Sequence, residues 1–308
     1  MPTALQKTIF YLKAIYITAA VIVSASYGVV ASIVLAFFRR RGLAQYTTGR
    51  LFYYLAYPVL RIGFRFVDGA SENYARYLSS SSWWSGSPEF LRPCVILSNH
   101  QSALDVLMLG RIFPPYCSVT SKASLRWVPF LGWFMALSGT VFLDRTNSRA
   151  SVATLSSAAD SVLARSQQSV FMFPEGTRSG FKVPGLLTPL KRGAFHMAVQ
   201  AQIPIVPIAV SNTSNLFDPS KKMVRPGTIK LKVLDPIPTE GLTREDVPQL
   251  AIKVEQMLEE AIKELGYSEV SGQIDGDDDD DQDGLETPLV QQQQQQQQQL
   301  EQLEQLVV

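Results

Sequence analysis

A run of 25 consecutive uncharged residues, Ala14–Phe38, constrains this chain more than any other feature. A helix needs about 20 apolar residues to cross the hydrocarbon core of a bilayer, so the run is long enough to span it with some tilt. A cleaved signal peptide usually carries a shorter apolar stretch of roughly 7–15 residues. Three arginines, Arg39–Arg41, follow directly. We therefore expect a retained membrane helix over residues 14–38, with a cleaved signal or a buried core helix as the alternatives.

Basic residues are unevenly distributed around this run. Lys7 and Lys13 precede it, whereas Arg39–Arg41 and Arg50 follow it. Positive charge is retained on the cytoplasmic side of membrane helices, so the C-terminal side is expected in the cytosol. A second apolar stretch, Leu51–Leu60, is too short to cross a bilayer. Its tyrosines between flanking arginines indicate a segment, extending to about residue 66, that lies in the membrane interface.

The formal net charge of +1 conceals two regions of opposite charge. Of the 27 acidic residues, eleven lie from Ser268 onward, where there is no basic residue. The other 16 share residues 1–267 with all 28 Lys and Arg, which gives that part a net charge of +12. A basic body behind a membrane helix attracts anionic lipids and anionic substrates, and the helix favours these partners over nucleic acid.

Three regions follow from this pattern: a membrane-associated segment (1–66), a folded domain (67–267) and an acidic, glutamine-rich tail (268–308). The tail is expected to stay solvated and disordered. Two cysteines cannot frame a disulfide scaffold, and with two histidines that lack zinc spacing they predict no metal site. A third apolar run, Val128–Leu143, fits lipid contact and protein core equally well. The sequence identifies no protein partner.

Short β-branched runs alternate with helical patterns in the folded domain, which predicts an α/β fold. The expected strands are Cys94–Leu97, Val170–Phe173, Ile205–Val210 and Ile229–Leu234. The expected helices are Ser102–Ile112, Ser151–Arg165, Gly193–Gln200 and Arg244–Leu265. The last of these helices has Thr243 and Asp246 at capping-box spacing and should stop at Gly266.

The first cluster of chemical interest, Asn99–Asp105, follows an expected strand. Histidine acts as a general base near neutral pH, and a carboxylate partner fixes its tautomer and stabilises its cation. His100 and Asp105 can meet if His100 lies in a loop and Asp105 in the first turn of the next helix. On one continuous helix, five residues would place them on different sides. Taken alone, this spacing is more often structural than catalytic.

The second cluster, Phe173–Ser179, also follows an expected strand. Arg178 is suited to bidentate binding of phosphate, Gly176 allows close approach of the backbone, and Thr177 offers a hydroxyl. Alone, it is read more simply as a Pro-Glu-Gly turn with a surface arginine. The two clusters together favour function, because ligands of open α/β sheets collect at the carboxyl ends of strands.

Two alternatives remain to an enzyme in which His100 acts as the base. A serine hydrolase would use Ser98 or Ser102, but neither lies in the Gly-x-Ser-x-Gly sequence of a nucleophile elbow. His196, the only other histidine, falls in an expected helix and is interpreted as structural. The second alternative is a non-enzymatic membrane-anchored protein that recruits partners through its tail.

The chain resembles the glycerolipid acyltransferases, and in particular the 1-acylglycerol-3-phosphate acyltransferases, in four ordered blocks over about residues 50–235. Asn99–Asp105 fits their N-H-x4-D motif and Phe173–Arg178 their F-P-E-G-T-R motif. Gly139–Arg145 is similar to a G-x-x-F-x-x-R segment, and Ile203–Ala209 to a late proline-containing strand. Lys122 begins a Lys-x2-Leu-x3-Pro pattern of the same branch.

This resemblance implies a mixed sheet flanked by helices and direct acyl transfer without metal, cofactor or covalent intermediate. His100, oriented by Asp105, would take the proton from the sn-2 hydroxyl of lysophosphatidic acid. That oxygen would attack the thioester of acyl-CoA, the co-substrate, to give phosphatidic acid for phospholipid biosynthesis. Glycerol 3-phosphate or another lysophospholipid is the alternative acceptor. The implied location is the endoplasmic reticulum membrane, with the active site on the cytosolic face.

The resemblance also assigns binding residues. Arg178 would hold the substrate phosphate, and Lys122 and Arg145 are further candidates for binding phosphate or CoA. The residues that would shape this site are Glu175, Gly176 and Thr177.

Overall fold

The structure is a computed structural model that describes residues 3–67, 93–144, 148–165 and 169–271. The acidic and glutamine-rich tail from residue 272 onward and the candidate Arg145 lie outside the described residues. The expected disorder of the tail therefore stays a prediction.

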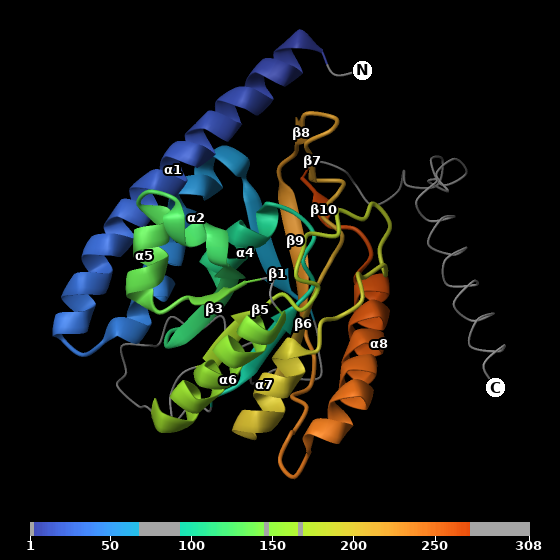
Figure 1. The fold of residues 1–308 in the computed structure, drawn as a ribbon. Coiled ribbons are helices and arrows are strands. Elements are labelled where there is room, and N and C mark those ends of the chain that lie inside the picture. The colour runs from blue at the N-terminus through green and yellow to red at the C-terminus, as the bar shows by residue number, and fades with distance from the viewer. Residues whose placement is uncertain (1–2, 68–92, 145–147, 166–168, 272–308) are drawn as a thin grey trace. The chain divides into compact units, whose positions relative to one another are not determined.

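An eight-stranded sheet forms the centre of the described fold, in the order β1-β9-β6-β2-β5-β3-β4, with β10 paired to β9 (Figure 1). The strands β6, β2, β5, β3 and β4 run parallel, whereas β9 runs antiparallel to β6. The sheet is therefore mixed, as expected. The strand bounds are β1 (Ile62–Phe66), β2 (Val95–Ser98), β3 (Cys117–Lys122), β4 (Val141–Leu143), β5 (Ser169–Met172), β6 (Ile205–Val210), β9 (Gly227–Val233) and β10 (Glu269–Val270).

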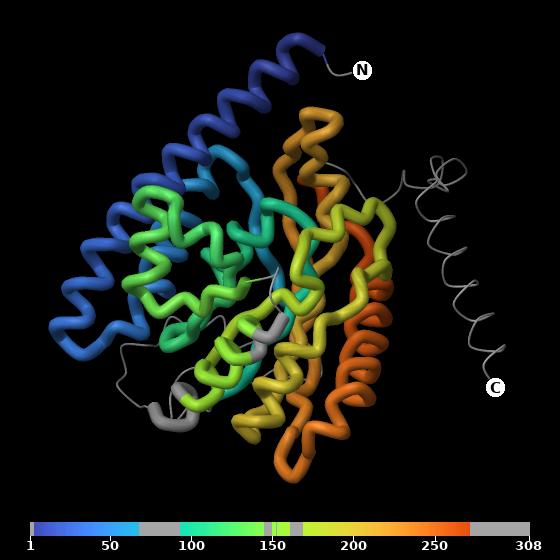
Figure 2. Tube along the Cα trace, in the orientation of Figure 1, coloured from blue at the N-terminus to red at the C-terminus, as the bar shows by residue number. Residues whose placement is uncertain are grey.

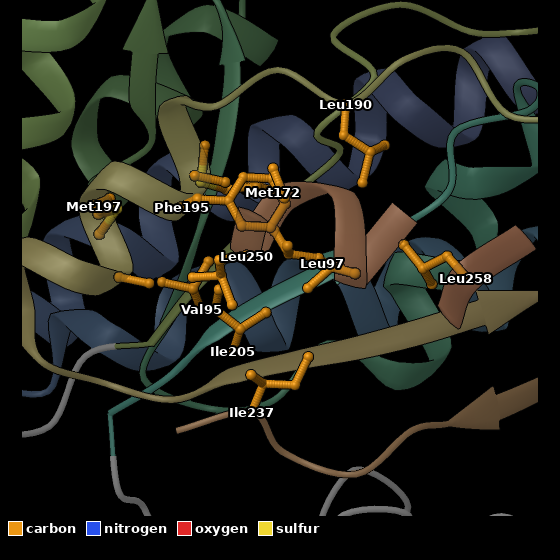
Figure 3. Close-up of a cluster of buried hydrophobic side chains, with 14 of the residues drawn as sticks. Val95, Leu97, Met172, Leu190, Phe195, Met197, Ile205, Ile237, Leu250 and Leu258 are labelled. Atoms are coloured by element: carbon orange, nitrogen blue, oxygen red, sulfur yellow. The ribbon is translucent and has the colours of Figure 1, made fainter. Parts of the chain in front are cut away.

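Helices cover both faces of the sheet, which explains why its central strands are apolar throughout rather than alternating with polar residues. On β2, Val95 and Leu97 pack into one core with residues of α6, α7 and α8 (Figure 3). Ile96 faces a second core with α2 and α4. The helix bounds are α2 (Ala44–Leu60), α4 (Leu104–Ile112), α6 (Ser148–Arg165), α7 (Gly193–Ala201) and α8 (Val247–Leu265).

The start and end of the last helix follow the sequence signals. Asp246 Oδ2 accepts hydrogen bonds from the backbone N–H and the hydroxyl of Thr243, at 2.8 and 2.9 Å. A short 3-10 turn, η5 (Arg244–Asp246), leads into α8, and Gly266 follows the last helical residue with a positive φ of 61°. Both capping predictions are confirmed.

The expected boundary between the membrane-associated segment and the folded domain, at residue 67, would separate β1 from the sheet to which it belongs. The apolar stretch Leu51–Leu60 belongs to α2, which begins at Ala44 and packs between α1 and α4. Residues Ile62–Phe66 form β1, which pairs in parallel with β9. The sheet thus extends into the segment that was predicted to lie in the membrane interface, because β1 finds its backbone partners on β9, which is distant in the sequence.

Helix α1 (Ala4–Phe37) is, among the described residues, the one helix long and apolar enough to cross a membrane. Its buried residues are small and recur on one face, which packs against α2 and α5 (Figure 2). They are Ala20, Ser24, Ala25, Gly28 and Ser32. The opposite face exposes large apolar side chains such as Ile15, Val23 and Ile33, so α1 is not a buried core helix.

The third apolar run is partly buried and partly exposed in the structure. Helix α5 (Leu131–Ser138) buries Gly132 and Met135, but Trp133 and Leu137 are exposed. Gly28 of α1 lies so close to α5 that a Cβ there would be 2.4 Å from the ring of Phe134. The packed side of α5 therefore holds α1 in place, and its other side adds apolar surface.

Candidate active site

The parallel register brings the sequence motifs to one edge of the sheet. His100 follows β2, the Pro174–Arg178 loop follows β5, and Lys122 is the last residue of β3. These three strands are neighbours and run in the same direction, so their carboxyl ends share an edge. This is where open α/β sheets bind ligands, because the loops that leave the strands gather there.

His100 and Asp105 form a direct pair. His100 Nδ1 lies 2.6 Å from Asp105 Oδ2, and the same oxygen accepts the backbone N–H groups of Gln101 (2.8 Å) and Ser102 (3.0 Å). Asp105 is in the first turn of α4 and is buried, with a side chain 3% exposed against 15% for His100. A carboxylate held by three donors keeps Nδ1 protonated, so Nε2 is the ring nitrogen that can accept a proton.

The ring of His100 is also fixed from its face. It stacks on Phe173, with the ring centroids 4.2 Å apart and an interplanar angle of 21°. Asp105 thus fixes the edge of the imidazole, and Phe173 fixes its plane. This arrangement suits a general base, which must present one nitrogen in a set direction.

Asn99 and Gln101, the neighbours of His100, anchor the loop to the end of β6. The Asn99 amide donates to the Val210 carbonyl (3.1 Å) and accepts the Val210 N–H (2.9 Å). The Gln101 amide donates to Val210 and Ser211 and accepts the N–H of Thr213 at 3.1 Å. The sequence predicts no role for Asn99 or Gln101, although both belong to the first motif and both are buried.

Glu175 lies beneath the site. It is fully buried, and one carboxylate oxygen accepts the backbone N–H of His100 while the other accepts that of Thr188 at 3.2 Å. Burial raises the pKa of this carboxyl, against the opposing effect of the two hydrogen bonds. Its contacts are therefore with the main chain of two loops, below the surface a substrate would touch.

The rest of the second motif runs alongside the His100 loop. Ser179 N donates to the His100 carbonyl at 2.8 Å, and Gly180 N donates to the Gln101 carbonyl at 3.3 Å. Thr177 and Arg178 are exposed. Within the described part of the chain, the Arg178 guanidinium has no hydrogen bond or ion pair. It is free to bind an anion beside the base.

Lys122 and Gly176 complete the predicted set. Lys122 is exposed at the carboxyl end of β3, the strand next to β5. Gly176 has a φ of +72°, a conformation that L side chains rarely adopt, so glycine is favoured there. The structure thus places the described candidates on one edge of the sheet and brings His100 into direct contact with both Asp105 and Glu175.

The two serines near His100 are engaged elsewhere. Ser98 Oγ donates to the Asn99 carbonyl at 3.4 Å and is fully buried. Ser102 Oγ bonds Thr213 Oγ1 (3.3 Å) and accepts the Leu104 N–H (3.1 Å). In the described residues neither hydroxyl is hydrogen-bonded to the His100 ring, which a serine nucleophile activated by this histidine would require.

Known proteins resemble this chain in sequence and in fold. Residues 83–211 match the family model described as Acyltransferase. A 1-acyl-sn-glycerol-3-phosphate acyltransferase of Saccharomyces cerevisiae is 40% identical over 266 residues, which cover 86% of this chain and 82% of the yeast protein. The chain belongs to the 1-acylglycerol-3-phosphate acyltransferase family. The resemblance noted from the motifs is confirmed, and the protein is an acyltransferase.

Two further comparisons agree with this family. The human 1-acyl-sn-glycerol-3-phosphate acyltransferase alpha is 38% identical over 174 residues, 56% of this chain and 60% of the human protein. The fold matches the crystal structure of the 1-acyl-sn-glycerophosphate (LPA) acyltransferase PlsC from Thermotoga maritima, with a TM-score of 0.60 and 22% identity. That match covers 85% of this chain and 95% of PlsC, so the fold extends well beyond the motif region.

Proposed function

We propose that this acyltransferase moves an acyl group from acyl-CoA to the sn-2 hydroxyl of lysophosphatidic acid and so forms phosphatidic acid for phospholipid biosynthesis. The acceptor is supported by the names of the yeast and human relatives. The chemistry is supported by one observation above the others, the 2.6 Å contact between His100 Nδ1 and Asp105 Oδ2 beside a loop that carries Arg178, which has no partner among the described residues.

The proposed reaction is a direct transfer. His100 Nε2 accepts the proton of the acceptor hydroxyl as its oxygen attacks the thioester carbonyl carbon. The carbon–sulfur bond then breaks, CoA leaves as a thiolate, and the imidazolium returns the proton to the thiolate. A thiol has a pKa of about 8.5, so the thiolate leaves readily and no strong acid is needed. The Asp105 carboxylate stabilises the imidazolium between these steps.

Arg178 and the loop around it are proposed to bind the acceptor phosphate. The exposed guanidinium can make two parallel hydrogen bonds to phosphate oxygens, and Thr177 adds a hydroxyl. Lys122 and Arg145 are further candidates for the phosphates of either substrate. The chemistry proposed here uses no metal or cofactor, because the base is a side chain and the acyl group arrives already activated as a thioester.

The membrane part of the proposal rests on α1. Its exposed apolar face suits contact with lipid, where the acceptor's acyl chain also resides. The three arginines after the helix and the net charge of +12 on residues 1–267 suit the anionic cytosolic surface of a membrane. We place the enzyme at the endoplasmic reticulum with its active site on the cytosolic side.

An acceptor panel tests the function. The full chain, purified in detergent and returned to lipid, is given radiolabelled acyl-CoA with lysophosphatidic acid, glycerol 3-phosphate, lysophosphatidylcholine or no acceptor. We expect labelled phosphatidic acid from the first acceptor and no transfer to the others. Transfer to glycerol 3-phosphate or lysophosphatidylcholine alone would overturn the acceptor assignment but keep the chemistry, and acceptor-independent thioester hydrolysis would favour a hydrolase. No turnover under any condition would favour the non-enzymatic alternative.

A further inference from the structure

Lys191 stands at the phosphate-binding loop, although no sequence motif pointed to it. It follows the segment that contains Thr188 and precedes α7 by two residues. Its backbone N–H donates to the Pro174 carbonyl at 2.9 Å, which fixes the position of Lys191 against the start of the loop that carries Arg178.

The side chain of Lys191 lies over Gly176. A Cβ on residue 176 would be 2.9 Å from both Cε and Nζ of Lys191 and 3.0 Å from its Cδ. The lysine stem therefore occupies the space that any larger residue at 176 would need. The ammonium is held next to the backbone that leads through Thr177 into Arg178.

The Lys191 ammonium has no counter-charge among the residues that the structure describes. Lys191 is exposed, and across residues 3–67, 93–144, 148–165 and 169–271 it forms neither an ion pair nor a side-chain hydrogen bond. Glu175, next to Gly176 in the chain, directs its buried carboxyl at the backbone N–H groups of His100 and Thr188. Lys191 and Arg178 are thus two cations without a partner among the described residues, on two segments joined by the hydrogen bond from Lys191 N to the Pro174 carbonyl.

A phosphate monoester needs more than one cation. It carries a charge of about −1.5 to −2 at neutral pH, which a single guanidinium only partly neutralises. The two side chains also complement each other chemically, since arginine offers a planar fork of donors and lysine a compact charge that can move to meet the remaining oxygen. The Ser179 N–H donates to the His100 carbonyl at 2.8 Å, so an anion bound on this loop would lie beside the base.

We propose that Lys191 is a second phosphate-binding cation, which acts with Arg178 to hold the phosphate of the acceptor lipid. This inference rests on the proposed function for the identity of the acceptor. It also assigns Gly176 a second role, since a glycine leaves room for the lysine stem as well as permitting the loop's conformation.

Steady-state kinetics with Lys191→Ala, Lys191→Arg and Arg192→Ala test the proposal. Arg192 is the matched control because it carries the same charge one residue away and acts electrostatically on His196. We expect Lys191→Ala to raise the KM for lysophosphatidic acid on the order of 10-fold, with the KM for acyl-CoA unchanged and partial recovery in Lys191→Arg. An unchanged KM for lysophosphatidic acid, an increase for acyl-CoA instead, or an equal effect of Arg192→Ala would overturn it.

A binding measurement separates this proposal from the proposed function. Glycerol 3-phosphate, a soluble phosphate monoester, is titrated calorimetrically into wild type and each variant. Weaker binding in Lys191→Ala but not in Arg192→Ala supports the cation site, whether or not lysophosphatidic acid is the acceptor. Equal binding by wild type and Lys191→Ala would overturn the site even if the acceptor panel succeeds.

Discussion

The buried carboxylate of Glu175 accepts the backbone N–H of His100, so the acidic residue of the second motif holds the main chain that carries the base of the first. Its other oxygen accepts the N–H of Thr188, three residues before Lys191. Glu175 thereby joins three parts of the proposed site: the proposed base His100, the loop proposed to bind phosphate and the segment that leads to Lys191. We therefore expect Glu175 to position these parts rather than to bind substrate directly.

Replacing Glu175 by glutamine should therefore lower turnover more than substrate binding. The amide has one oxygen to accept hydrogen bonds, so one of the two backbone N–H groups would face an NH2 group instead. We expect kcat to fall about 10- to 100-fold through displacement of His100, with a smaller change in the KM for lysophosphatidic acid. Kinetics and a thermal melt of the same sample check this. A variant that melts normally but loses only affinity for lysophosphatidic acid would show that Glu175 binds substrate directly.

The roles of His100 and the nearby serine can be separated by substitution. His100→Ala and Asp105→Asn should each reduce kcat about 10²- to 10⁴-fold, because the first removes the base and the second replaces the carboxylate that stabilises its imidazolium by a neutral amide. Ser102→Ala removes a hydroxyl that bonds Thr213 and Leu104 N, not His100, and should retain most of the activity. The measurement is acyl transfer at saturating substrate. Full activity in His100→Ala, or loss confined to Ser102→Ala, would contradict the proposed base.

Gly176 should show two separable effects when it is replaced by alanine. Its φ of +72° makes any side chain strained, and the new Cβ would also push Lys191 aside. Gly241 is the matched control, since it has a φ of +79° and a Cβ added there would meet nothing within 4 Å. Both alanine variants should lose about 1 kcal/mol of stability, but only Gly176→Ala should raise the KM for lysophosphatidic acid. Equal kinetics in the two variants would show that the Lys191 contact has no functional weight.

The sequence predicted those parts of the fold that are locally encoded. Strands β2, β5 and β6 are apolar runs buried on both faces, and α8 carries its own capping signals. Strand β1 was assigned to the membrane segment instead, because Ile62–Phe66 follows a tyrosine-rich helix and becomes a strand only by pairing with β9. Strand β3 was missed because its sequence, CSVTSK, is mostly polar.

In the candidate site, too, the local contacts could be predicted from the sequence and the long-range contacts could not. The His100–Asp105 pair spans five residues, so a loop followed by a helix turn suffices to predict it. The contact between Glu175 and His100 joins residues 75 positions apart and depends on β5 pairing with β2. Lys191 has no motif of its own. The available signal was a pair of basic residues directly before an expected helix, and it gains meaning only when the fold brings it over Gly176.

Asp218 should make stability depend on pH in acid. Burial alone would raise its pKa, but hydrogen bonds from Lys182 (2.7 Å) and Ser220 outweigh burial and lower the pKa to about 2. A carboxyl with a depressed folded-state pKa stabilises the fold above its unfolded value and loses that contribution as pH falls through the folded value. We therefore expect the stability advantage of wild type over Asp218→Asn to be complete near pH 6 and to shrink between about pH 4 and pH 2.

Thermal melts of the two proteins across that pH range provide the measurement. Glu264→Gln is the control, because Glu264 is paired with Lys232 but its side chain is 64% exposed, against 4% for Asp218. Exposed pairs contribute little, so this variant should follow wild type closely at every pH. The side chain of Lys182, the partner of Asp218, is 48% exposed, so solvent screening should keep the stabilisation by this pair modest. A difference between wild type and Asp218→Asn that stays constant from pH 6 to pH 2 would mean that the carboxylate charge does not stabilise this part of the fold.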